Sequence, residues 1–165
     1  MNKTLKLLFL ATLGLLATIS ELSAADFPRG PEVSITPGKL CELTVKYRYA
    51  EKIAYCDRDV EYQLKEIIIA EYDQKFGYKI HSMPRADFKI DHYIPLCAGG
   101  SNDITNLWPQ HKSIYEQTDP LEPVVCAKMA QGLLKQSDAV SYIKRAKAHP
   151  EQTKQILLEL QEVRR

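Results

Sequence analysis

The chain has 165 residues, 45% of them hydrophobic, and a formal net charge of +1 from 22 Lys and Arg against 21 Asp and Glu. This balance argues against a protein that wraps nucleic acid with positive charge over its whole surface, because such proteins are more basic. Any contact with nucleic acid would need a local patch. The basic residues that flank the central stretch could supply one: Lys79, His81, Arg85, Lys89 and Lys112.

The N-terminus has the layout of a secretory signal peptide. Lys3 and Lys6 precede an uncharged run over residues 7–19, and small residues follow at 23–25. We predict cleavage after Ala25, which leaves an exported protein, periplasmic or secreted. The run is shorter than the ~20 apolar residues of a membrane-spanning helix, so we expect no membrane contact after cleavage. About 140 residues then remain, enough for one domain with a core and too few for two ordinary domains.

Residues 26–48 are predicted to form an extended arm, because prolines and glycines recur in its first half. Near its end, residues 43–49 alternate enough to form a short strand. A core helix is expected over residues 60–76, where apolar residues recur every three or four positions. Asp59 can cap this helix, and Gly77 can end it.

Three more helices are predicted in the C-terminal part of the chain. The tetrapeptide Asp119-Pro-Leu-Glu122 is a capping-box signature that opens a helix ending near Gly132. Residues 137–147 form the next helix, and a last amphipathic helix follows Pro150. No internal repeat is present, so the helices are expected to pack as one unit.

Between these helices, residues 88–110 predict two strands joined by a loop. Apolar and polar residues alternate from 88 to 94, as in a half-buried strand. A turn-forming cluster follows at 99–103. A second short apolar run at 104–108 stops at Pro109, where the chain is expected to enter a helix.

Asp91 and His92 are the candidate chemical groups of the first strand, where alternation would send their side chains to opposite faces. A carboxylate is a hard oxygen ligand for a divalent cation such as Mg²⁺. A neutral imidazole can take the proton of an attacking water. The Asn106 amide could bridge backbone groups across the loop and hold His92 in one orientation. These residue types suit the hydrolysis of a phosphodiester, whereas Trp108 is interpreted as a core residue.

Three segments of this stretch resemble the HNH endonuclease family: Asp91-His92-Tyr-Ile-Pro95, Gly99-Gly-Ser-Asn-Asp103 and Asn106-Leu-Trp-Pro-Gln110. The resemblance implies a ββα-metal finger at about residues 86–117, inside a helix-rich α+β domain over residues 49–165. It also implies that His92 is the general base. Asp91 would be a metal ligand, and Asn106 would orient the base.

The family's third functional position, a metal ligand on the helix after the second strand, has no clean counterpart. The spacing found in many members of the family, counted from Asn106, places this ligand at Tyr115, and a tyrosine is a poor metal ligand. His111, Gln110 and Glu116 are the alternatives, and we take His111 as the second metal ligand. The cofactor implied is one divalent cation, with Mg²⁺ as the first choice and Mn²⁺ and Zn²⁺ as alternatives.

The chain has four cysteines, Cys41, Cys56, Cys97 and Cys126, and its predicted export to an oxidising compartment favours disulfides. Of the three possible connectivities we choose the sequential one, 41 with 56 and 97 with 126; buried free thiols are the alternative. In the chain-entropy model these bonds would contribute about 3 and about 3.6 kcal/mol. No C-x-x-C pair occurs, so a structural zinc knuckle is not predicted.

The residues and the resemblance together predict an exported, metal-dependent endonuclease that hydrolyses DNA, with RNA left open as a substrate. The alternative is a secreted binding or structural module that keeps the finger as a disulfide-linked scaffold and has lost the metal. An exported effector that acts on another cell's DNA would use the same chemistry.

Overall fold

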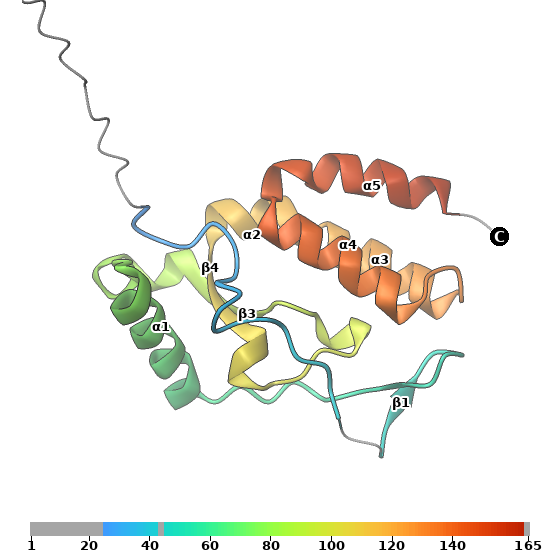
Figure 1. Ribbon diagram of the computed structural model, residues 1–165, viewed down its shortest axis with the longest axis horizontal. Coiled ribbons are helices and arrows are strands. Elements are labelled where there is room, and N and C mark those ends of the chain that lie inside the picture. Colours follow the sequence, from blue (N-terminus) through green and yellow to red (C-terminus); the bar gives the residue numbers. More distant parts are fainter. Residues whose placement is uncertain (1–24, 43–44, 164–165) are drawn as a thin grey trace, which may run out of the picture.

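The computed structural model describes residues 25–42 and 45–163 (Figure 1). The predicted signal peptide therefore lies outside the described residues, except for Ala25. The described chain is α+β, with helices and two small two-stranded sheets. In chain order its strands and α-helices are β1 (Tyr47–Arg48), β2 (Ile53–Ala54), α1 (Tyr62–Phe76), β3 (Phe88–His92), β4 (Leu107–His111), α2 (Lys112–Thr118), α3 (Leu121–Ala130), α4 (Gln136–Ala148) and α5 (Thr153–Glu162). None of the helices in this described part has the length and apolar character needed to cross a bilayer.

The centre of the fold is the antiparallel hairpin of β3 and β4, which α2 follows at once (Figure 1). The strands pair from Phe88 opposite His111 to His92 opposite Leu107. The loop between them contains two 3-10 helices, η3 (Leu96–Ala98) and η4 (Ile104–Asn106). The predicted order of strand, loop, strand and helix is confirmed.

The second strand lies three residues later than predicted, because residues 104–106 form η4. Asp103 caps η4, since its carboxylate accepts a hydrogen bond from the Thr105 N–H at 2.9 Å. β4 then continues through Pro109, which pairs with Ile90. A two-stranded sheet tolerates this proline because each strand has an outer edge where no ladder partner needs an N–H.

α1 begins two residues later than predicted, and Asp59 does not cap it. Its N-cap is Glu61, whose side chain makes no capping hydrogen bond, and the residues before it have no regular structure. The predicted end is confirmed. Gly77 adopts a left-handed φ of 74°, which glycine reaches without strain, and its N–H donates to the Asp73 carbonyl at 3.0 Å.

α3 starts without the predicted capping box. Its N-cap is Pro120, and no side chain caps the first turn. The two residues of the expected box bind lysines instead. Asp119 accepts a hydrogen bond from Lys89 at 2.6 Å, and Glu122 accepts one from Lys147 at 2.7 Å.

Residues 25–42 form an arm without helices that packs against the domain. Thr36 is buried, and its hydroxyl lies 2.8 Å from the hydroxyl of Tyr72 on α1. Further along, the Cys41 N–H donates to the Gly99 carbonyl in the loop between β3 and β4, at 2.7 Å. The arm therefore braces both α1 and the central loop. Of the strand predicted at 43–49, the described residues contain β1, which pairs with β2.

Both predicted disulfides are confirmed. Cys41–Cys56 joins the arm to the segment that follows β2, and Cys97–Cys126 joins η3 to α3. The second bond therefore fixes a helix from the C-terminal part of the chain against the central loop.

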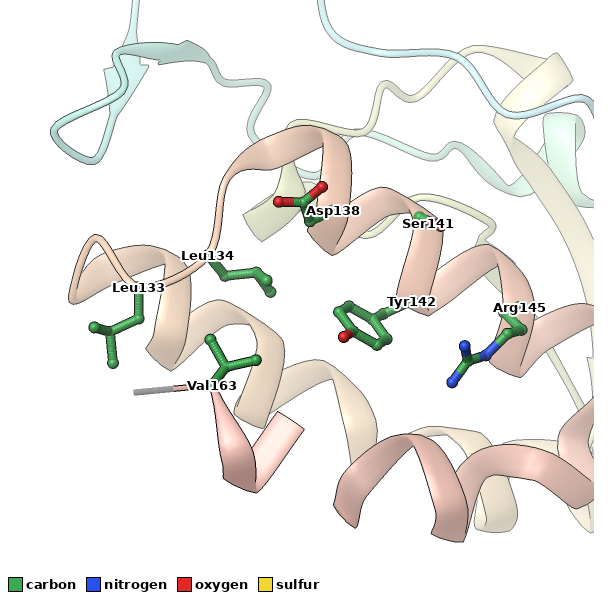
Figure 2. A pocket seen from close by; sticks show the side chains of 7 residues that line it. All are labelled: Leu133, Leu134, Asp138, Ser141, Tyr142, Arg145 and Val163. Atoms are coloured by element: carbon green, nitrogen blue, oxygen red, sulfur yellow. The ribbon is translucent and has the colours of Figure 1, made fainter. Parts of the chain in front are cut away.

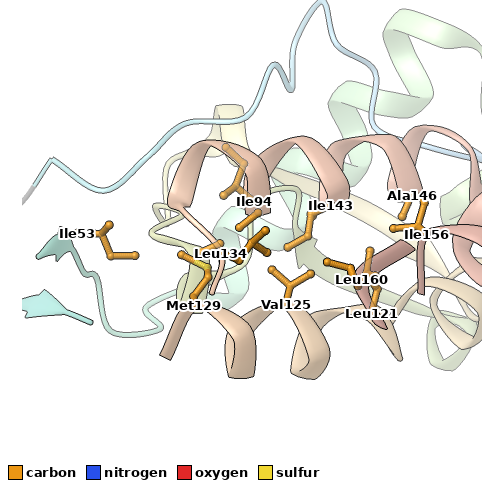
Figure 3. Close-up of a cluster of buried hydrophobic side chains, with 12 residues drawn as sticks. Ile53, Ile94, Leu121, Val125, Met129, Leu134, Ile143, Ala146, Ile156 and Leu160 are labelled. Carbon is orange, nitrogen blue, oxygen red and sulfur yellow. The ribbon is translucent and has the colours of Figure 1, made fainter. Parts of the chain in front are cut away.

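The apolar core consists of two clusters. One joins α1 and α2 to the hairpin and includes Trp108, which is fully buried as predicted. The other joins α3, α4 and α5 and includes Ile94 (Figure 3). Ile90 belongs to the first cluster, so the chain passes from one cluster to the other within a few residues. Asp91 and His92 lie in this segment, where the two apolar clusters meet.

Candidate active site

His92 is the last residue of β3, and both of its ring nitrogens have a partner. Nδ1 lies 3.1 Å from Nη1 of Arg58, and Nε2 lies 2.9 Å from Oδ1 of Asn102. A guanidinium can only donate, so Nδ1 is the unprotonated nitrogen and Nε2 carries the proton. Asn102 is held in this orientation because its Nδ2 donates to the Asp57 carbonyl at 2.7 Å. The lone pair that can accept a proton is therefore that of Nδ1.

The surroundings of His92 favour its neutral form. Burial lowers the pKa of the imidazole below its ordinary value of 6.5, because the charged ring loses hydration. The hydrogen bond to Asn102 raises the pKa, and the positive charge of Arg58 lowers it. With a net pKa below 6.5, the ring is neutral at pH 7, as a general base must be.

Three carboxylates gather near one another, and one of them belongs to Asp91, the residue before His92. Asp91 comes from β3, Asp119 from the residues just before α3, and Glu122 from the first turn of α3. Each offers one oxygen, and the three oxygens lie within 4.8 Å of one another. This cluster is the candidate metal site.

Two lysines contact the cluster. Lys147 of α4 is 1% exposed, and its Nζ donates to Asp91 and Glu122 at 2.7 Å each and to the His92 carbonyl at 2.6 Å. Nζ of Lys89 lies 3.6 Å from Asp91 and forms a closer ion pair with Asp119. Three carboxylates and two ammonium groups leave a formal charge of −1.

The buried ion pair keeps its members charged. Burial alone would raise the pKa of the Asp91 carboxyl, but the ammonium groups of Lys147 and Lys89 outweigh it and hold the pKa below its ordinary value. Burial also lowers the pKa of Lys147, and the carboxylates of Asp91 and Glu122 raise it to well above its ordinary value. Asp91 is therefore an anion at neutral pH, as a metal ligand must be.

Two observations fit a divalent cation to this cluster. The donors are carboxylate oxygens, which Mg²⁺ and Mn²⁺ prefer. In addition, Oδ1 of Asp119 is buried and has no hydrogen-bond partner among the described residues. A buried polar oxygen costs free energy unless a partner binds it, and a cation would be such a partner. The cation would share Asp91 and Glu122 with Lys147.

Asn106 is fully buried and bridges the loop backbone as predicted. Its Oδ1 accepts from the Ile94 N–H at 2.9 Å, and its Nδ2 donates to the carbonyls of Ile94 and Ser101 at 3.0 and 2.8 Å. The structure gives it no direct hydrogen bond to His92. Asn102 is the direct partner, so Asn106 supports the base through the loop that carries Asn102.

His111 does not join the acidic cluster. It is the N-cap of α2, where its Nδ1 accepts from the Ser113 N–H at 3.2 Å, and its ring stacks on Phe27 with 4.0 Å between centroids. It pairs with Phe88, which lies on the opposite face of β3 from Asp91 because side chains alternate along a strand. The structure therefore does not bring the two predicted metal ligands together.

The other candidates for the third position also lie elsewhere. Gln110 is fully buried, and its Nε2 donates to the Thr118 hydroxyl at 2.9 Å. The ring of Tyr115 lies 4.9 Å from Nζ of Lys89 and offers no ligand to the cluster. Glu116 borders a separate cavity between α2 and α5.

The sequence patterns missed Asp119, Glu122 and Lys147. The capping-box pattern already explains the two acids, so they carried no separate signal. One signal was present: Glu122 precedes Cys126 by one helical turn, and the predicted bond to Cys97 brings that turn beside the central loop. Lys147 had no signal, because a lysine near the end of a helix is usually solvated.

A cavity of about 360 Å³ lies between His92 and two of the carboxylates. His92, Asp91, Glu122 and Arg58 all border it, and so does Cys97. A second cavity, of about 380 Å³, lies between α4 and the end of α5 (Figure 2). None of its lining residues belongs to β3, β4 or their loop. The lining consists of Leu133, Leu134, Asp138, Ser141, Tyr142, Arg145 and Val163. We therefore place the candidate active site in the first cavity.

Carboxylates largely neutralise the predicted basic patch. Its pairs are Lys79 with Asp26, His81 with Asp73, Lys89 with Asp119 and Lys112 with Asp87, all at 2.6–3.0 Å. Arg85 donates to the Phe88 carbonyl. In the described part of the chain, Arg58 by contrast has no carboxylate partner, although it borders the cavity.

Comparisons of the chain with protein-family models, with curated proteins and with solved structures give no match. The function therefore has to be argued from the geometry of the site.

Proposed function

We propose that the chain is an exported, metal-dependent endonuclease of the HNH type that hydrolyses phosphodiester bonds in DNA, with RNA as a further candidate substrate. One observation carries the proposal: a neutral His92 and two members of the carboxylate cluster, Asp91 and Glu122, border the same cavity beside a β-hairpin that a helix follows. The two disulfides support export, because such bonds form and persist in oxidising compartments.

His92 would act as the general base. Its Nδ1 takes a proton from water as the water oxygen bonds to phosphorus, and the bond from phosphorus to the leaving sugar oxygen breaks. The leaving oxygen takes a proton from solvent, and His92 returns its proton to solvent, so the protons balance. Asn102 contributes by holding the Nε2–H tautomer, in which Nδ1 is unprotonated and can accept a proton.

Asp91, Asp119 and Glu122 would hold the cation, with Mg²⁺ as the first choice and Mn²⁺ and Zn²⁺ as alternatives. When bound, the cation supplies positive charge that stabilises the negative charge developing on the phosphate and leaving oxygens. Lys147 holds Asp91 and Glu122 close together, and its charge keeps Asp91 ionised.

Cleavage of supercoiled plasmid tests the proposal. The mature chain from Asp26 onward, with its disulfides intact, is incubated in Mg²⁺, in Mn²⁺ and in EDTA. His92→Ala is the test variant, and His149→Ala is its control because His149 is exposed and lies outside the cavity. We expect nicking that needs the cation, disappears in His92→Ala and persists in His149→Ala. Equal cleavage by His92→Ala would refute the assignment of the base.

A second candidate function is a secreted binding or structural module without catalytic activity. The observation in its favour is that Lys147 and Lys89 already occupy the carboxylate cluster with positive charge. In this case the protein would be folded, as shown by a cooperative thermal transition, and would cleave neither DNA nor RNA with any of the three cations.

A further inference from the structure

Arg58 covers the nitrogen that the proposed reaction needs. Its Nη1 donates to Nδ1 of His92 at 3.1 Å, and its Nη2 donates to the Ile90 carbonyl at 3.1 Å. The imidazole has one lone pair in its neutral form, and this hydrogen bond occupies it. A water molecule therefore cannot give its proton to His92 until Arg58 moves away.

The present hydrogen-bond partners of Arg58 are weaker acceptors than a phosphate would be. The side chain is exposed, and in the described structure it makes no ion pair. Both of its present acceptors, a ring nitrogen and a carbonyl oxygen, are neutral. A phosphate entering the cavity would offer two anionic oxygens, which match the fork of a guanidinium and form stronger hydrogen bonds than neutral acceptors do.

We propose that Arg58 is a catalytic residue that caps His92 in the free protein and transfers to the scissile phosphate when the substrate enters. This inference rests on the proposed function. Nη1 exchanges Nδ1 for a phosphate oxygen, while the bond from Nη2 to Ile90 keeps the guanidinium near the site. The base is then uncovered only when a phosphate is in place. The transferred charge also stabilises the transition state of hydrolysis.

A purely structural role for Arg58 makes a different prediction. If Arg58 only held the His92 ring in place, its removal would misorient the base, and a guanidinium ion added to the solution would not restore the reaction. A role in transition-state charge stabilisation, by contrast, can be supplied from solution. Rescue by guanidinium therefore separates the two roles.

The test measures plasmid cleavage in Mg²⁺ by wild type, Arg58→Ala and Arg58→Lys, with Arg145→Ala as the control. Arg145 is also an arginine at the border of a cavity, but it lies on α4, pairs with Glu159 and does not border the cavity of His92. We expect Arg58→Ala to lose at least ~100-fold in kcat/KM. Arg58→Lys should retain an intermediate rate, since it keeps the charge without the fork. Guanidinium at tens of millimolar should restore part of the activity of Arg58→Ala and none of His92→Ala.

Three outcomes would overturn the inference: cleavage by Arg58→Ala within threefold of wild type, a loss that guanidinium does not reduce, or an equal loss in Arg145→Ala. If wild type itself does not cleave, the proposed function fails instead. Nitrogen NMR of wild type in EDTA gives a test that needs no variant. Adding a short DNA oligonucleotide should shift the His92 Nδ1 and Arg58 side-chain signals together, and unchanged signals with bound DNA would refute the transfer.

Discussion

Replacing Lys147 by methionine removes a buried cation and keeps most of the side-chain volume. The Lys147 side chain is 2% exposed and bonds to Asp91, 13% exposed, and Glu122, 29% exposed. Removing one partner of a buried ion pair typically costs about 3–5 kcal/mol, because the remaining charge stays buried without compensation. Glu122 can turn toward water, so we expect the lower end of this range, about 3 kcal/mol. For a domain of this size that corresponds to a decrease in Tm of roughly 10 °C.

The same variant should respond more strongly to a divalent cation. Without the ammonium group, Asp91 and Glu122 are available to the metal alone. A cation at a concentration 100 times its Kd stabilises the folded state by about 2.7 kcal/mol. Mg²⁺ or Mn²⁺ should therefore recover most of the Tm that Lys147→Met loses, and should raise the Tm of wild type by less.

Calorimetric unfolding of the oxidised protein, in EDTA and in each cation, measures both effects. Lys154→Met serves as the control, because Lys154 lies on the exposed side of α5, where a substitution is expected to change stability by less than about 0.5 kcal/mol. The reasoning is refuted if Lys147→Met is as stable as wild type in EDTA. It is also refuted if the cation raises the Tm of wild type but leaves that of the variant unchanged.

Three more predictions follow from the site. Burial lowers the pKa of His92 below 6.5, so kcat/KM for DNA should be nearly level from about pH 8.5 to 7.5 and should fall only in more acidic solution. A kcat/KM that rises on acidification would exclude His92 as the base. Asn106→Ala leaves the buried Ile94 N–H and two loop carbonyls without partners, so urea unfolding should show a loss of about 3 kcal/mol. Asn106→Asp should lose no less, because its buried carboxylate would face the carbonyl oxygens of Ile94 and Ser101. Replacing Cys97 and Cys126 by serine should lower the free energy of unfolding by about 3.6 kcal/mol. It should also reduce the rate of cleavage, because this bond fixes α3, which carries Glu122, against the central loop. An unchanged rate of cleavage after reduction by dithiothreitol would contradict the second effect.

The hairpin and the helix after it could be predicted because their signals lie close together in the chain. Alternation, a turn cluster and a proline all fall within residues 88–110, and each acts through neighbouring residues. The start of β4 was misplaced because Asp103 caps a 3-10 helix, a local alternative that the apolar pattern does not report. The pattern also gave only a turn at Gly100. The structure adds that a Cβ there would lie 1.7 Å from the Ile94 carbonyl oxygen, so that only glycine fits.

The carboxylate cluster could not be predicted in the same way. Asp91 comes from β3, whereas Asp119 and Glu122 come from the start of α3, and Lys147 reaches them from α4, so only tertiary packing brings these groups together. Asp119 and Glu122 satisfied a helix-capping pattern, and the sequence alone cannot show that a lysine would compete for them. His111 was predicted as the second metal ligand in place of Tyr115, but strand register turns its side chain away from Asp91.

The reach of Lys147 has a consequence for when the site is assembled. It contacts Asp91 across 56 positions of the chain, and contacts of such separation require a long loop to close, which costs entropy and slows their formation. A chain that folds from its N-terminus can form the hairpin with His92 before α4 has emerged. Until α4 docks, Asp91 and Glu122 lack the ammonium group that lies between them, and the Cys97–Cys126 bond alone ties α3 to the central loop. The complete cluster of carboxylates and lysine is thus expected to be among the last parts of the fold to form.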